Sequence, residues 1–425
     1  MTDTQKTPQP GNRLWTRDFT IITLGSVVSM LGNSMSFFAM NLMVLDYTGS
    51  TLLYAVYMVA YTAPQLIVPI FSGAILDRFS RRKMIYTLDF IIAGLYIVVA
   101  GLLSTGWFSF PLFALFCFVT GSIWSIYLVA YESFYPLLIT EGNYSKAYSI
   151  ASVLETMAAV MVPVSTCLYN MVGIAPLLFA NGCCFFVAAV METQIRAEEK
   201  YIEKQKKAAE EEGLGLSGPR RMLRDVKEGF QYLYNEKGLR AIAVYFTFSA
   251  LVGGVSAVVT LPYFRSTFDN GEYVFMLVHA MSYVGRALGG AIHYRWKLPS
   301  RYKFVTALAV YVIIGVAEGI YLFFPIPVMM LCLFIMGLGG VTSYTIRISA
   351  TQNYVPDEKK GRFSGAFQML NTLGWLVGEM AAGVLAEAFP KRGILLAAEL
   401  IGVAAALLVI GGRRKHVEPI YNRQV

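Results

Sequence analysis

Long runs of hydrophobic residues, separated by short polar segments, occupy most of this chain. A helix of about 20 apolar residues crosses a bilayer, so each long run predicts one membrane-spanning helix. The period-two alternation of a membrane β-barrel is absent. We predict twelve spans, at about 19–45, 52–76, 84–104, 108–137, 147–172, 174–193, 240–263, 272–294, 304–324, 326–354, 363–386 and 393–411.

The polar segments divide the chain into five predicted parts. These are an N-terminal arm (1–18), a six-helix bundle (19–193), a linker (194–238), a second six-helix bundle (239–411) and a tail (412–425). Both halves have a basic loop after their second span and a charged loop after their fourth, which predicts two pseudo-repeats. An all-α membrane protein of six plus six helices with a long linker is typical of transporters.

Composition and charge agree with this prediction. The chain is 56% hydrophobic and only 15% charged, which excludes an ordinary soluble domain. Of its 35 Lys and Arg residues, the loops on one side of the predicted membrane hold only Arg265, Lys391 and Arg392. By the positive-inside rule, we expect both termini and the linker in the cytoplasm. We expect the membrane to be a prokaryotic plasma membrane. Topology then explains the net charge of +8, and nucleic acid is not an expected partner.

Few residues suggest chemistry. The five cysteines lie in apolar runs, the three histidines are scattered, and no phosphate-binding Walker loop occurs. No nucleophile is paired with a base. We therefore expect no catalytic residues, no metal and no cofactor, and a protein that is not an enzyme.

The loop between the second and third predicted spans carries a motif. GAILDRFSRRK, Gly73 to Lys83, resembles the cytoplasmic loop motif of the major facilitator superfamily. Ser80 stands where that family usually has glycine. The matching residues are Gly73, Asp77, Arg78, Arg81 and Arg82. The resemblance implies two bundles that move by alternating access.

The charges of this loop suggest a conformational latch. Asp77 is expected to pair with Arg81 and to face the positive N-terminal end of the eleventh span. Breaking that contact would accompany the change of state. The alternative is that the loop acts only as a positively charged topological signal.

Other stretches resemble a subgroup of the family. Residues 220–240 and 359–368 are similar to segments of macrolide-efflux-like and siderophore-exporter-like members. Two positions depart from proton-linked drug antiporters: Cys117 replaces an arginine, and Glu379 replaces a proline after a retained glycine pair. These departures argue against antiport of that particular kind, but they leave the fold unaffected.

Ionisable residues at membrane depth are costly and therefore informative. Glu155, near the middle of the fifth span, is the best candidate for a proton or cationic-substrate site, with a helix–helix hydrogen bond as the alternative. Its counterpart in the second repeat is Asn371. The resemblance assigns Asp89, Glu318 and Glu399 to outer support helices, so we expect them to be structural.

Four further charged residues are candidates for coupling or substrate binding. Glu132 would belong to a water-exposed wall of aromatic side chains, or it would form one half of a pair of residues that gates the cytoplasmic side. Arg286 and Arg347 would bind an anionic group or neutralise a glutamate. Glu379 would be a second coupling acid or the partner of another polar group.

Uncharged residues complete the candidate site. Asn33 and Gln65 would hydrogen-bond substrate or join helices. Trp124, Tyr127 and Tyr131 would line an adaptable apolar cavity, or simply pack.

From these features we expect a monomeric secondary transporter, in contact with membrane lipid, that works by alternating access. It would use a proton gradient for antiport and efflux of a lipophilic or amphipathic small molecule of the drug or siderophore class. The alternative is a transporter of lysophospholipid or another lipid with the same fold.

Overall fold

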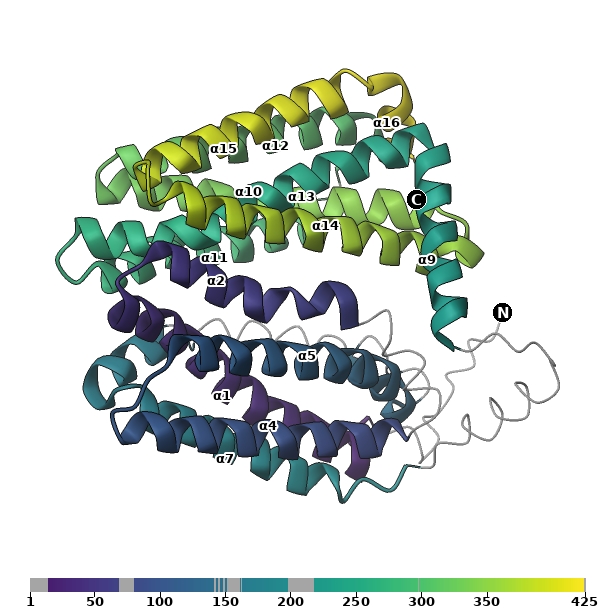
Figure 1. Cartoon of the computed structure of the whole chain (residues 1–425). Coiled ribbons are helices and arrows are strands. Elements are labelled where there is room, and N and C mark those ends of the chain that lie inside the picture. The colour runs from purple at the N-terminus through teal and green to yellow at the C-terminus, as the bar shows by residue number, and fades with distance from the viewer. Residues whose placement is uncertain are drawn as a thin grey trace. The chain divides into compact units, whose positions relative to one another are not determined.

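Helices make up the whole of the described secondary structure (Figure 1). The structure is a computed structural model that describes residues 14–68, 80–140, 143, 146–147, 150, 161, 163–197, 218–296 and 298–423. Within these ranges no strand occurs, and nine helices are long and apolar enough to cross a membrane. The prediction of an all-α membrane protein is therefore confirmed, whereas the number of twelve spans and the pseudo-repeat stay predictions.

The chain divides into two compact units. The first comprises residues 1–46 and 67–222. Its described helices are α1 (Arg17–Thr48), α4 (Arg81–Ser104), α5 (Phe110–Phe134), the 3₁₀ turn η1 (Tyr135–Leu138) and α7 (Ile174–Glu192). Helices α4 and α7 pack along one another (Figure 1). Ser80 begins α4 as its N-cap, since its side chain accepts a hydrogen bond from the Lys83 amide at 3.1 Å.

The second unit comprises residues 47–66 and 223–425. Its helices are α2 (Thr51–Thr62), most of α9 (Gly218–Asn235), α10 (Lys237–Thr267), α11 (Gly271–Arg295), α12 (Lys303–Ile320), α13 (Ile326–Tyr354), α14 (Asp357–Leu385), α15 (Lys391–Ala405) and α16 (Arg414–Tyr421). The main pairings are α10 with α14 and α11 with α13. Because α2 packs against α14 and α10, it groups with the second half of the chain. The predicted domain boundaries at 193 and 239 stay predictions.

Glycines allow α10 and α14 to pack in backbone contact. A Cβ added to Gly378 would overlap the carbonyl oxygen of Leu251, and one added to Gly254 would overlap that of Trp375. Small residues let membrane helices approach closely where no hydrophobic driving force acts between them. This close packing of α10 on α14 fixes the position of the residues of α14 that belong to the candidate functional site.

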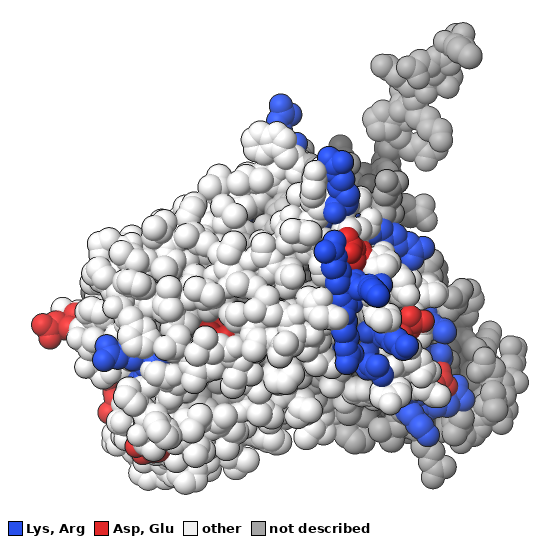
Figure 2. All heavy atoms as spheres, turned by 90° about the horizontal axis from the view of Figure 1, so that it is seen from above, with Lys and Arg blue, Asp and Glu red and all other residues white. Residues whose placement is uncertain are grey.

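Large apolar side chains cover the outer surface of the second unit. On α15, Leu400 is 61% exposed, and Leu408, just beyond that helix, is 74% exposed. Figure 2 shows a broad uncharged area beside Lys and Arg side chains gathered at one end. Such a surface suits the hydrocarbon core of a bilayer.

Candidate functional site

A cavity of about 360 Å³ lies inside the second unit. Four helices form its wall: α10, α12, α14 and α15. The lining residues include Tyr245, Phe246, Tyr311, Glu318, Asn371, Trp375 and Glu399. Of these, Asn371 is a residue that the sequence singled out.

Glu379 adjoins this cavity through Trp375. The Glu379 side chain is 0% exposed, and its Oε1 accepts a hydrogen bond of 2.7 Å from the Trp375 indole nitrogen. Its Oε2 has no well-placed donor, although Thr62 lies beside the carboxyl group. Tyr54 of α2 is close enough to interact with it electrostatically. No Lys or Arg in the described ranges lies within ion-pair distance of Glu379. A fully buried acid without a basic partner is therefore part of this site.

Arg347 lies next to the cavity and faces aromatic rings. Its guanidinium carbon is 4.8 Å from the centroid of Phe246, which lines the cavity, and 5.1 Å from that of Phe367. Tyr344 is a third ring, at 5.5 Å. Cation–π attraction therefore stabilises the guanidinium group, and the predicted binding of an anionic group or a glutamate by Arg347 stays a prediction.

The aromatic candidates of the first unit form a ladder on one face of α5. Trp124 stacks on Tyr127 with ring centroids 5.6 Å apart, and Tyr127 stacks on Tyr131 at 5.8 Å. Tyr131 also accepts a hydrogen bond of 3.1 Å from Ser26 of α1. Tyr127 is buried. These contacts show how the rings pack, and their predicted role in lining a substrate path stays a prediction.

A buried pair of carboxyl groups lies beside this ladder. Asp89 of α4 and Glu192 of α7 are both 0% exposed and are close enough to share a hydrogen bond. Among the described residues, no other group donates to them. Two such groups stay side by side away from water only with a proton or another cation between them. From the sequence, Asp89 is expected to be structural, whereas Glu192 is not among the candidate residues.

The remaining candidates are placed as follows. Asn33 on α1 and Gln65 just beyond α2 are half-buried, whereas Glu132 on α5 and Arg286 on α11 are exposed. Glu155, the best candidate of the sequence analysis, lies outside the described residues.

The latch motif is described only in part, because Gly73, Asp77 and Arg78 also lie outside the described residues. Arg81 donates a hydrogen bond of 3.0 Å to the Ser133 carbonyl in the last turn of α5. Arg82 donates one of 2.5 Å to the Ile195 carbonyl, just beyond α7. Both arginines therefore place positive charge at the negative C-terminal ends of neighbouring helices.

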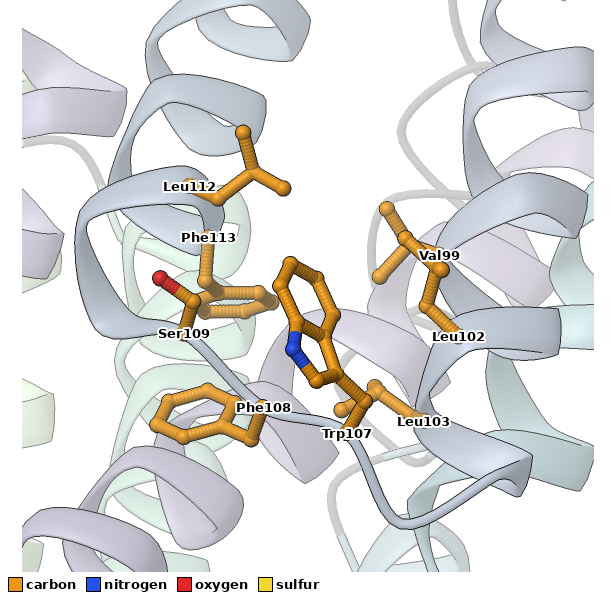
Figure 3. A pocket seen from close by; sticks show the side chains of 8 residues that line it. All are labelled: Val99, Leu102, Leu103, Trp107, Phe108, Ser109, Leu112 and Phe113. Carbon is orange, nitrogen blue, oxygen red and sulfur yellow. The ribbon is translucent and has the colours of Figure 1, made fainter.

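Another hollow, in the first unit, is too small for a substrate. Figure 3 shows the Trp107 indole among Leu103, Phe113 and Val99, between the ends of α4 and α5. Its volume is about 30 Å³, roughly the share of one water molecule in the liquid. The cavity of the second unit is more than ten times larger.

Comparison with known proteins identifies the family. The model of the Major Facilitator Superfamily matches residues 22–379 and, in a second overlapping match, residues 301–420. This chain belongs to the major facilitator superfamily. It is accordingly a multi-pass membrane transporter rather than an enzyme.

Its relatives in this superfamily include two proteins of Bacillus subtilis (strain 168). The uncharacterized MFS-type transporter YkuC is 23% identical over 250 residues, which are 58% of this chain and 56% of that protein. The uncharacterized MFS-type transporter YfiS is 25% identical over 397 residues, which are 90% of this chain and 87% of that protein.

Two solved structures of transporters share the fold. A point mutant of the nucleoside transporter NupG has a TM-score of 0.64 at 11% identity, over 94% of this chain and 98% of that one. A point mutant of the peptide transporter POT has a TM-score of 0.66 at 12% identity, over 96% of this chain and 97% of that one. At such identities the likeness establishes the fold alone.

Proposed function

We propose that this transporter exports a lipophilic or amphipathic small molecule, of the drug or siderophore class, in exchange for protons. It would do so as a monomer in a prokaryotic plasma membrane, with both termini in the cytoplasm and no cofactor other than the proton gradient. The macrolide-efflux-like subgroup remains part of this proposal.

The observation that carries proton coupling is the environment of Glu379. This carboxyl group is fully buried on α14, which the sequence predicts to be the eleventh span, is held by one indole donor and has no basic partner in the described ranges. Burial without a countercharge favours the neutral acid, whereas a hydrogen-bond donor or admitted water favours the carboxylate. A helix movement that changes this environment would therefore take up or release a proton.

The test is flux of a fluorescent lipophilic substrate in proteoliposomes with an imposed pH gradient. Wild-type protein should move the substrate faster with the gradient than without it. Glu379→Gln keeps an oxygen that accepts from Trp375 but cannot carry the proton, so gradient-driven flux should disappear while expression persists. Glu418→Gln is the matched control, because Glu418 is an acid on the tail helix α16, outside the spans.

Three outcomes would contradict parts of this proposal. Equal wild-type flux with and without a gradient would exclude proton coupling. Normal gradient-driven flux in Glu379→Gln would remove Glu379 from the mechanism and leave Glu155, for which Glu155→Gln is the corresponding test. Transport of a lysophospholipid but of no drug-like substrate would favour the lipid alternative.

A further inference from the structure

The cavity of the second unit lies at membrane depth and has the size of a ligand site. Glu399 stands eight residues after Lys391, the first residue of α15, and hence about 12 Å along the helix axis. The volume of about 360 Å³ falls in the range of small-molecule pockets, about 300–1,000 Å³. All the lining residues belong to the second unit.

Two carboxyl groups meet at its wall. Glu318 of α12 and Glu399 of α15 lie close enough to share a hydrogen bond, and Ser256 of α10 lies close enough to Glu318 to form another. Glu399 is only 5% exposed. Within the described part of the chain, neither acid forms an ion pair with Lys or Arg. Two neighbouring carboxylates repel each other in such a place, so the pair shares a proton, and a cation in the cavity would stabilise the charge of the remaining carboxylate.

Glycines leave room for this pair. A Cβ on Gly315 of α12 would lie 3.2 Å from Oε2 of Glu399, and one on Gly402 of α15 would lie 3.6 Å from the same atom. Both glycines also line the cavity. The carboxyl group of Glu399 is thus accommodated by space on both helices.

The rest of the wall combines aromatic rings with one unsatisfied acceptor. Tyr245, Tyr311 and Trp375 contribute rings, whose faces attract cations, whereas the Phe246 ring already contacts the Arg347 guanidinium. The Oδ1 atom of Asn371 is buried without a donor among the described groups. This oxygen is a hydrogen-bond acceptor on the cavity wall that does not belong to the two acids. A ligand that donates a hydrogen bond would satisfy it.

We infer that this cavity binds a small organic cation with a single positive charge, held between the Glu318–Glu399 pair and the aromatic rings. A monovalent ammonium group matches the single negative charge of the pair, and its apolar substituents match the rings. This inference extends the proposed function, since it names the class of molecule that the exporter would carry. Binding, however, is measurable whether or not transport is coupled to protons.

The test is isothermal titration calorimetry on the full chain in detergent. The probe is benzyltrimethylammonium, whose charge does not depend on pH, and the comparators are neutral benzyl alcohol and anionic benzoate. The cation should bind at least about tenfold more tightly than either comparator, and Glu399→Gln and Glu318→Gln should each weaken it by about tenfold. Ala250→Leu fills the cavity but keeps both acids, and it should also abolish binding.

Glu418→Gln is the matched control, because Glu418 is an acid on the tail helix α16 and does not line the cavity. It should bind the cation like wild type. Because binding is measured without a pH gradient, failure of the coupling proposal and failure of this inference are distinguishable. Melting temperatures of all variants establish that they are folded. Equal binding of benzyl alcohol, preferred binding of benzoate, or undiminished cation binding in both folded Gln variants would overturn the inference.

Discussion

Replacing Gly378 by alanine tests the backbone contact that positions the candidate site. The added methyl group would overlap the Leu251 carbonyl oxygen, whereas ordinary contact begins at 3.4 Å. The axes of α10 and α14 must therefore separate by roughly 1 Å or more, because neither the carbonyl nor a Cβ atom can rotate away. Overpacking of this kind costs about 1–3 kcal/mol. The melting temperature in detergent should accordingly fall by several degrees.

Gly365→Ala on the same helix is the control for this experiment. A Cβ there meets no described atom within 4 Å. Alanine is favoured over glycine in a helix interior by about 1 kcal/mol, so this variant should melt at or above the wild-type temperature. Since both variants gain the same helix propensity, the difference between their melting temperatures measures only the close packing of α10 on α14. If Gly378→Ala proved as stable as Gly365→Ala, the close packing of α10 on α14 would be refuted.

Three further predictions concern single contacts. Trp375→Phe keeps a ring but removes the 2.7 Å donor to Glu379, so stability should fall by about 1 kcal/mol and gradient-driven flux severalfold; unchanged flux would show that the indole does not position the acid. Arg347→Lys loses the planar group that faces three rings, and thermal unfolding should show a loss of about 0.5–1 kcal/mol; equal stability would contradict the cation–π contact. On α16, the hydrogen bond from Arg414 lowers the pKa of Glu418 below its ordinary value of 4.5. The stability that this pair adds is therefore present above pH 4.5 and lost as the pH falls through the lower folded pKa; hydrogen exchange of α16 that already rises between pH 7 and 5 would contradict it.

The hydrophobic pattern predicted the spans well because lipid requires long apolar helices. The predicted span at 326–354 coincides with α13, and that at 174–193 differs from α7 by one residue. The prediction for the eleventh span was less accurate, because α14 begins at Asp357 rather than at 363. Its first turns are polar, and a helix that continues beyond the membrane has no hydrophobic signal there.

The candidate site was predicted only in part. Counting between the repeats drew attention to Asn371, and the cost of a buried charge drew attention to Glu379 and Arg347. The structure places all three in or beside one cavity of the second unit. Trp375, which connects Glu379 to this cavity, carries no charge and stands in an apolar run, so its sequence context gave no signal.

The acids on α12 and α15 show why the position of a helix in a bundle does not determine the role of its residues. A peripheral helix still has one face toward lipid and one toward its neighbours. On α15 the exposed face carries Leu400, whereas Glu399, about 100° away around the helix axis, lines the cavity. An almost uniformly apolar sequence does not reveal which face of such a helix points toward its neighbours, but its glycines do. Gly315 precedes Glu318 by three residues, and Gly402 follows Glu399 by three. Residues three apart share a helix face, so a membrane-depth acid with a glycine at that spacing indicates a carboxyl group that points into space between helices rather than into lipid.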